Sequence, residues 1–205
     1  MAITLYTFPR SSGTRVHWAL EELGTPYALH TLDREGGEHR GPAYLAIHPN
    51  GKVPALVDGD ETYFESLAIL IYLGEHYGVD KGLWPGRGPA RAGALSWTVW
   101  SQTELQTYMM QFIYHGIDSP VSYAPDQRSA ATAGYNGKNF EQHLDMLEAR
   151  LADREHLFGD FTFADLAVAS ILGEGRHLGA PLGDHPRVSG WLDGCLARPA
   201  RKRAS

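Results

Sequence analysis

The segment that decides the fold runs from Gly51 to Val57 and reads Gly-Lys-Val-Pro-Ala-Leu-Val, with Phe-Glu-Ser following at 64–66. Proline cannot donate a hydrogen bond to a β-ladder, so Pro54 is expected at the first residue of a strand. X-Pro bonds are also the only peptide bonds for which the cis form costs as little as about 0.5–1 kcal/mol. A cis bond before Pro54 would turn the backbone N–H and C=O of Val53 outward. The segment therefore predicts a docking edge for a short extended peptide.

Glu65 and Ser66 precede an apolar stretch with helical character and are expected to begin a helix. The first turn of a helix carries unpaired N–H groups and the positive end of the helix dipole, and both favour a carboxylate. An anion site is therefore expected a few residues from the docking edge. The alternative is an ordinary helix start with an acidic first turn.

The composition sets limits on the class of protein. The 205 residues allow one large domain or two small ones, and 43% hydrophobic with 20% charged residues is typical of a soluble globular chain. The net charge of −6 argues against nucleic-acid binding, which requires a basic surface. The basic cluster at 198–203 is expected to be a solvated helix end. With no apolar run that could span a bilayer, no signal-peptide pattern and a single Cys195, a cytoplasmic protein is predicted.

Residues 1–79 alternate strand and helix patterns. The expected strands are 3–8, 27–32, 55–57 and 62–64, and the expected helices are 16–23, 42–47 and 67–73. The Asp-Gly-Asp-Glu sequence at 58–61 predicts a tight hairpin between the last two strands. The order βαβαββα is that of a thioredoxin-like domain, so the fold class is α/β followed by an all-α part. Residues 80–89, rich in glycine and proline, predict a linker.

Residues 90–205 predict an all-helical C-terminal domain, a helical bundle without strand patterns. A helix is expected over 90–115, then a long loop over 116–137, a helix over 140–151 and a last helix over 187–198. Thr162 and Asp165 predict a capping box at the start of a further helix, with aspartate in place of the usual glutamate or glutamine.

Four of these features, in this order, resemble the cytosolic glutathione transferase (glutathione S-transferase) family. They are the strand and turn from Leu5 to Ser12, the segment from His48 to Leu56, the pair Glu65-Ser66, and the box from Thr162 to Asp165. Together they are specific for the fold, whereas the activity does not follow from the fold alone, because the same scaffold serves non-enzymatic proteins. The sequence Ser-Ser-Gly-Thr-Arg at 11–15 is similar to the serine-type, bacterial-like classes.

The resemblance implies that glutathione binds the first domain as a co-substrate, by β-augmentation along the strand entered at Pro54. Ser66 would take the γ-glutamyl carboxylate and Glu65 the ammonium group, while Lys52, or else His39, would meet the glycyl carboxylate. The expected glutathione-binding residues are thus His39, Lys52, Val53, Pro54, Glu65 and Ser66. The histidines show no metal-ligand pairing, so no metal is expected.

A hydroxyl group is expected to activate the glutathione thiol. A free thiol has a pKa of about 8.5, and lowering it by about two units takes roughly 2.7 kcal/mol of preferential thiolate stabilisation. A hydroxyl hydrogen bond at a helix N-terminus is a suitable source. Aligned on Arg15, Ser11 takes the place of the catalytic serine of the serine-type classes. The register of the cysteine-type classes puts Ser12 at the cysteine instead, and in a third alternative one serine merely caps the helix.

The tyrosine that serves other classes of the family falls at Thr7 in this alignment. Tyr6 points to the opposite face of the strand and is expected to pack in the core. Cys195 is expected to be a buried apolar residue rather than a reactive thiol.

The second substrate is expected to meet the sulfur between the two domains. The residues expected to line its site are Phe8, Arg10, Tyr108 and Phe112. The loop at 116–137 is either a lid or a neutral insertion.

The function that follows is transfer of the glutathione thiolate to an apolar electrophile, by substitution or addition, as in detoxification. One alternative is a glutathione-dependent isomerase of the maleylacetoacetate type, in which the serines precede a cysteine where this chain has Gly13. The other is a non-catalytic binding or scaffold protein.

A homodimer is expected from the resemblance and from the prevalence of two-fold dimers. Tyr72, Tyr77 and the start of the helix after Pro89 are the candidate contacts. Glu104 would reach the glutathione bound to the partner subunit.

Overall fold

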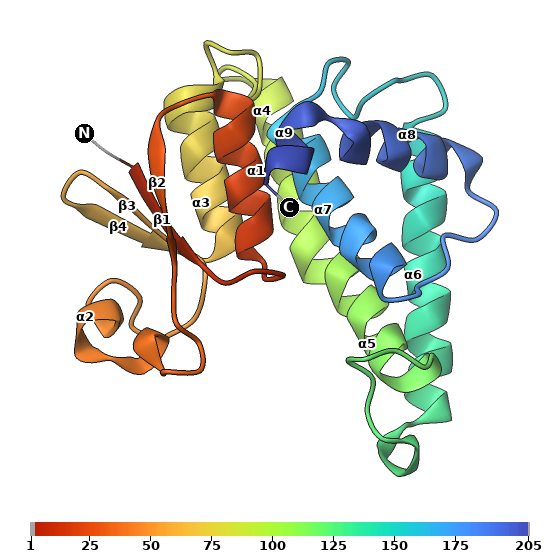
Figure 1. Cartoon of the computed structure of the whole chain (residues 1–205). Helices are drawn as coiled ribbons and strands as arrows, with labels where there is room; N and C mark the ends of the chain where they lie inside the picture. The colour runs from red at the N-terminus through yellow and green to blue at the C-terminus, as the bar shows by residue number, and fades with distance from the viewer. Residues whose placement is uncertain (1–2, 205) are drawn as a thin grey trace. The chain divides into compact units, whose positions relative to one another are not determined.

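The computed structural model describes residues 3–204, and the chain forms two compact units. The first consists of residues 1–86 together with 197–205, and the second of residues 87–196. The first unit contains a four-stranded sheet with helices, whereas the described residues of the second unit are helical apart from loops and one isolated β-bridge (Figure 1).

The sheet has the strand order β2-β1-β3-β4. Its strands are β1 (Ile3–Thr7), β2 (Tyr27–Thr31), β3 (Ala55–Asp58) and β4 (Glu61–Phe64). β1 pairs parallel with β2 and antiparallel with β3, and β3 pairs antiparallel with β4. The expected hairpin is confirmed, since only Gly59 and Asp60 separate β3 from β4, and Gly59 has a φ of 63°. With the helices between them, these strands confirm the thioredoxin-like βαβαββα order.

Two helices cover one face of this sheet. They are α1 (Gly13–Leu23) and α3 (Ser66–Leu73), which lie side by side (Figure 1). Alternate residues of β1 face them, because side chains of a strand point to opposite faces in turn. Leu5, Leu20 and Ile69 have no exposed surface in this core. The carboxyl end of β1 and the start of α1 therefore meet at one edge of this layer.

The other face carries the short helix α2 (Pro42–Leu45). Tyr44 of α2 is 3% exposed and packs in a cluster with Leu32 and Ala55, against which Tyr6 also lies. The expectation that Tyr6 packs on this opposite face is thus confirmed. The Tyr44 hydroxyl donates to the Lys52 carbonyl at 2.6 Å and so fastens the segment that leads into β3.

The helices of the second unit are α4 (Pro89–Trp100), α5 (Gln106–Gly116), α6 (Ala130–Arg150), α7 (Phe163–His177) and α8 (Pro186–Ala197). A π-helical segment, Ser101–Leu105, joins α4 to α5, so the helix expected over 90–115 is nearly continuous. The part of the chain that the structure describes contains no helix long and apolar enough to cross a bilayer.

The expected loop over 116–137 is wrong in its second half, because α6 begins at Ala130. The Ser129 hydroxyl caps this helix by accepting from the Thr132 N–H. The residues that follow Ser129 are mostly small and give no apolar periodicity, but alanine has the highest helix propensity and serine is a strong N-cap. The loop therefore spans residues 117–129.

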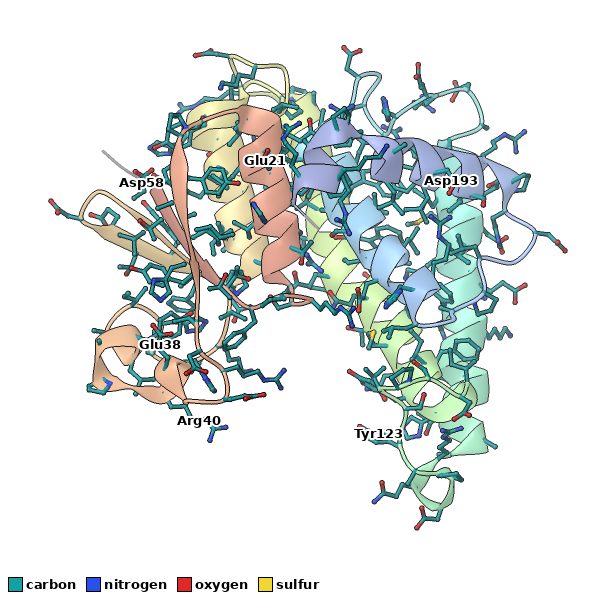
Figure 2. The ribbon with its side chains drawn as sticks, viewed as in Figure 1. Glu21, Glu38, Arg40, Asp58, Tyr123 and Asp193 are labelled. Carbon is teal, nitrogen blue, oxygen red and sulfur yellow. The ribbon has the colours of Figure 1, made fainter. Side chains whose placement is uncertain are left out.

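The chain ends in a separate helix, α9 (Pro199–Arg203), which belongs to the first unit. Arg198 donates to both carboxylate oxygens of Glu22 on α1, at 2.6 and 2.8 Å. Arg203 pairs with Glu21, which is labelled on α1 in Figure 2. The expectation of a solvated basic end is therefore wrong for Arg198, whose side chain is 32% exposed, whereas Arg203 is solvated as expected, with its side chain 56% exposed. The bidentate pair of Arg198 with the Glu22 carboxylate orders its side chain against α1.

Candidate functional site

The turn between β1 and α1 brings two hydroxyl groups together. The Ser11 Oγ lies 3.1 Å from the Thr7 Oγ1 and donates to the Phe8 carbonyl at 2.8 Å. It also accepts the N–H of Gly13, the first residue of α1, at 3.2 Å. Thr7 is 7% exposed and Ser11 is half-buried. The Ser11 hydroxyl therefore sits at the positive end of a helix in a fixed orientation.

Ser12 makes a different contact. Its side chain is exposed, and its hydroxyl donates to the Val53 carbonyl at 3.3 Å. Ser12 does not cap α1 with its side chain. The structure thus brings the β1–α1 turn to the segment preceding β3, a contact across 41 residues of sequence.

The Val53–Pro54 peptide bond is cis, and Pro54 directly precedes the first residue of β3. Pro54 was expected at the first residue of the strand and lies one residue before it, because β3 begins at Ala55. Pro54 is buried and Val53 is half-buried. Lys52 is exposed beside them, so its ammonium group is open to solvent and to an anionic ligand.

Glu65 and Ser66 lie where β4 gives way to α3, as expected. Ser66 is 4% exposed and is the first residue of the helix. Glu65 has a φ of 67°, in the left-handed region that costs a non-glycine residue of order 1–3 kcal/mol. Such residues are concentrated at active and binding sites. Glu65 is exposed, next to the buried first residue of α3.

A buried histidine lies against this corner. His48 is 1% exposed and its ring lies 4.9 Å from that of Phe64. Burial lowers the pKa of His48, Glu65 acts to raise it and Lys52 to lower it. His48 is therefore held largely neutral at pH 7, and the Asn50 N–H approaches its Nδ1 at 3.3 Å.

His39 lies in the turn of 3-10 helix Glu38–Arg40, whose first and last residues are labelled in Figure 2. Its ring packs edge-on against Phe8, with centroids 5.4 Å apart. The Nδ1 atom of His39 is buried without a hydrogen-bond partner. A Cβ at Gly51, which has a φ of 57°, would lie only 2.7 Å from the His39 carbonyl oxygen, so glycine lets these two loops approach. The structure thus brings His39 and Phe8 together beside the segment that holds Lys52.

Arg34 belongs to the same surface and was missed by the sequence reasoning. Its guanidinium lies 5.9 Å from the centroid of the Phe8 ring. Arg10, which was expected at the site, is exposed in the β1–α1 turn and has a φ of 56°. No sequence signal distinguishes Arg34 from other loop cations, because its contact depends on the path of a loop.

The expected residues of the second unit have partners of their own. The Tyr108 ring lies 5.0 Å from His143, and Phe112 packs against Gly116 and Gly137, where an added Cβ would lie within 3.0 Å of its ring. The Glu104 carboxylate lies 3.1 Å from the His143 Nε2, yet its side chain is 56% exposed.

The loop at 117–129 is fastened to the end of α5. Ser122 donates to the Ile113 and Ile117 carbonyls at 2.8 and 2.9 Å. Arg128 donates to the carbonyl of Tyr123, labelled in Figure 2, at 2.7 Å and to Asp118 at 2.9 Å. These bonds give the loop a defined conformation.

The capping box at Thr162 is confirmed, and its carboxylate has more partners than the motif requires. Asp165 has no exposed surface and accepts from the Thr162 and Leu157 N–H groups at 3.0 and 2.9 Å and from the Trp191 indole N–H at 3.1 Å. Cys195 is fully buried, as expected. Within residues 3–204, no three His, Cys, Asp or Glu side chains form a group that could hold a metal ion.

Two family models match the chain. The model described as glutathione S-transferase, N-terminal domain, matches residues 1–75, and the model described as glutathione S-transferase, C-terminal domain, matches residues 99–199. Glutathione S-transferase 4 of Zea mays is 33% identical over 195 residues, which cover 94% of this chain and 86% of the relative. The family resemblance seen in four short motifs thus extends over most of the chain.

Solved structures with glutathione bound have the same fold. A theta class glutathione S-transferase from Xanthomonas axonopodis pv. citri, crystallised with glutathione, has a TM-score of 0.82 and 28% identity, covering 99% of this chain and 96% of that one. A family member from Pseudomonas fluorescens with two glutathione bound has a TM-score of 0.83 and 28% identity, covering 99% and 92%.

Proposed function

Since the chain belongs to the glutathione S-transferase family, we propose that it adds the thiolate of glutathione to an apolar electrophile, by substitution or addition. The observation that carries this proposal is the Ser11 hydroxyl, which is fixed at the start of α1 by the Gly13 N–H and is coupled to Thr7. A donor placed there stabilises an anion more than a neutral thiol. The same residue would thus bind the sulfur and activate it.

Glutathione is proposed to lie along the edge entered at Pro54, with its peptide groups paired to the Val53 backbone. Its γ-glutamyl carboxylate is assigned to the buried Ser66 at the start of α3, and its ammonium group to the exposed Glu65. The glycyl carboxylate is assigned to Lys52, with His39 as the alternative. In support, all of these residues belong to the first compact unit.

Ser11 is proposed as the thiolate donor in preference to Ser12. The Ser12 hydroxyl donates to the Val53 carbonyl, so its role is to hold the segment that binds the peptide. Ser11 instead has a half-buried hydroxyl with a second hydroxyl beside it. A thiol pKa about two units below its free value of about 8.5 is the expected result.

Binding is tested by thermal unfolding. Glutathione should raise Tm in a concentration-dependent way, because a ligand of the native state stabilises it by mass action. The double variant Glu65→Ala with Ser66→Ala should lose most of that shift, whereas Glu61→Ala on the exposed part of β4 is the matched control. A double variant that binds as tightly as the parent would show that the anion site is assigned wrongly.

A second candidate reaction is suggested by the relative with two glutathione bound. A site with room for a second glutathione could accept a disulfide as the second substrate. The thiolate of the bound glutathione would attack one sulfur of the disulfide, and the other sulfur would leave as a thiolate. An electrophile panel should therefore contain a small disulfide beside a chlorodinitrobenzene. Glutathione binding without turnover of either would favour a non-catalytic binding protein.

A homodimer is also proposed. The Tyr72 and Tyr77 hydroxyls both donate to Asp58, with Tyr72 at 2.9 Å. Tyr63 stacks on Tyr72 with ring centroids 4.0 Å apart. These tyrosines, on β4, on α3 and on the π-helical segment Gly74–Gly78, are well suited to an interface, where tyrosine is enriched.

A further inference from the structure

The Ser11 hydroxyl has one hydrogen, and in the structure that hydrogen is directed to the Phe8 carbonyl oxygen, 2.8 Å away. A serine that stabilises a bound thiolate must direct the same hydrogen to the sulfur. On the proposed function, binding of glutathione therefore takes a hydrogen bond away from Phe8. This exchange weakens the effect of Ser11 unless another donor replaces it.

Thr7 provides such a donor. Its hydroxyl already donates to the same Phe8 carbonyl oxygen at 3.2 Å, and its Oγ1 lies 3.1 Å from the Ser11 Oγ. Thr7 is 7% exposed at the last position of β1, so its side chain is held by the sheet and the core. Its hydroxyl can donate to either oxygen with little movement.

We propose that Thr7 is a positioning residue that lets Ser11 serve the thiolate. When the Ser11 hydrogen turns to the sulfur, the Thr7 hydroxyl continues to donate to the Phe8 carbonyl, which therefore keeps a donor. In the alternative proton arrangement Thr7 donates to the Ser11 Oγ, which polarises the Ser11 O–H and strengthens its bond to the sulfur. In both arrangements Thr7 acts through Ser11 and does not touch glutathione. This inference rests on the proposed function.

Gly13 provides the space for this pair. An added Cβ at Gly13 would lie 1.9 Å from the Thr7 Oγ1 and 3.1 Å from the Ser11 Oγ. No side chain at position 13 is compatible with the observed place of the Thr7 hydroxyl. The Gly13 N–H, which donates to the Ser11 Oγ, keeps the serine oxygen in place while its hydrogen changes partner.

The hydrogen-bond partners recorded for the two hydroxyls are each other, the Phe8 carbonyl and the Gly13 N–H. None of these groups titrates near neutral pH. A change in the pH profile after substitution of Thr7 therefore reports on the bound thiol rather than on a nearby acid or base of this pair.

The test is a double-mutant cycle between Thr7 and Ser11. For each variant, kcat/KM for a chlorodinitrobenzene is measured as a function of pH. Thr7→Val keeps the shape and removes the hydroxyl, and Thr7→Ser keeps the hydroxyl; each is made in the parent and in Ser11→Ala. Thr7→Val should raise the kinetic pKa of the bound thiol by about 0.5–1 unit and lower kcat/KM about three- to tenfold below that pKa. Thr7→Ser should stay near the parent, and Thr7→Val should have no further effect in Ser11→Ala.

Three results would overturn the inference. They are a parental pH profile for Thr7→Val, a loss of similar size in Thr7→Ser, and an undiminished effect of Thr7→Val in the Ser11→Ala background. Glutathione affinity and Tm are measured on every variant, because they separate a folding defect from loss of the positioning of Ser11. If Thr7→Val does not fold, Thr7→Ala takes its place. Failure of the proposed function gives a different result, since the parent itself would then show no glutathione binding or turnover.

Discussion

At the β1–α1 turn, two adjacent serines direct their hydroxyl groups to different backbone carbonyls. Ser11 donates to Phe8 within the turn, whereas Ser12 donates to Val53 before β3. The sequence alone left both serines open as the thiol donor, because the choice depended on the alignment register. The contacts separate them, and they give the two serines different proposed tasks.

A prediction at this scale concerns Gly13→Ala. The new methyl group would overlap the Thr7 hydroxyl, so the turn must shift, and overpacking of this kind typically costs about 1–3 kcal/mol. Chemical denaturation should show that loss, and turnover should fall with it. Gly134→Ala on α6 is the matched control, since an added Cβ there meets nothing within 4 Å and alanine favours a helix by about 1 kcal/mol. A Gly13→Ala variant as stable and active as the parent would contradict the close packing of the turn.

Site residues could be predicted from the sequence where their positions are set by their neighbours in the chain. Ser66 was placed correctly from the sequence and Pro54 within one residue, because a proline entering a strand and a serine beginning a helix are set by the nearest residues. The contact between Thr7 and Ser11 depends on the missing side chain at Gly13, and that of Arg34 with Phe8 depends on a loop path. Neither depends on a pattern that can be read in sequence.

At the scale of elements, the start of α7 depends on one carboxylate. Asp165 binds N–H groups of the loop before the helix and of Trp191 on α8, so Asp165→Ala leaves several buried donors without an acceptor. Each unsatisfied buried donor costs roughly 1–3 kcal/mol, so a loss of about 3 kcal/mol or more in the free energy of unfolding is expected by denaturant titration. Thr162→Ala should cost only about 1 kcal/mol. Equal effects of the two variants would show that the wider network adds nothing to the capping box.

A pH-dependent contact joins α6 to the segment before α8. Burial acts to lower the pKa of His185, but hydrogen bonds to Asp145 and to the Leu182 carbonyl raise it overall above its ordinary value of 6.5. A raised pKa means that the folded state binds a proton more tightly than the unfolded chain. The stability that protonated His185 contributes is therefore complete below pH 6.5 and is lost as pH rises through the folded pKa. Asp145→Asn should therefore destabilise the protein more at about pH 5.5 than at about pH 8.5.

Denaturation at the two pH values measures this difference directly. Glu141→Gln, at an exposed position of the same helix, is the control and should change stability equally at both. A penalty for Asp145→Asn that grows toward alkaline pH would reverse the assigned sign.

Among the elements, those with strong periodicity were predicted within a few residues, and the errors have physical causes. The start of α6 was missed because its first residues are small and leave no apolar stripe. The pairing of α9 with α1 was missed because ion pairs that join residues 22 and 198 leave no local pattern. Elements built from local propensity and burial can be predicted, whereas long-range polar contacts cannot.

At the scale of the whole molecule, the proposed assembly is a homodimer. Light scattering at micromolar concentration should give twice the chain mass of 22.6 kDa.

If Glu104 reaches the glutathione of the partner subunit, Glu104→Gln should weaken glutathione binding, although His143 competes for the Glu104 carboxylate at 3.1 Å. His143→Gln should then strengthen binding by freeing that carboxylate. A monomer at this concentration would remove both the interface and the role of Glu104 across it.

The central claim is that Ser11 holds the thiolate of glutathione bound in the first unit. Ultraviolet titration of the bound thiol measures it most directly. The parent should titrate about two units below the free thiol value of about 8.5, Ser11→Ala should return toward that value by about one unit or more, and Ser12→Ala should stay near the parent. A bound thiol that titrates near its free value in the parent, or identically in the parent and Ser11→Ala, would contradict the claim.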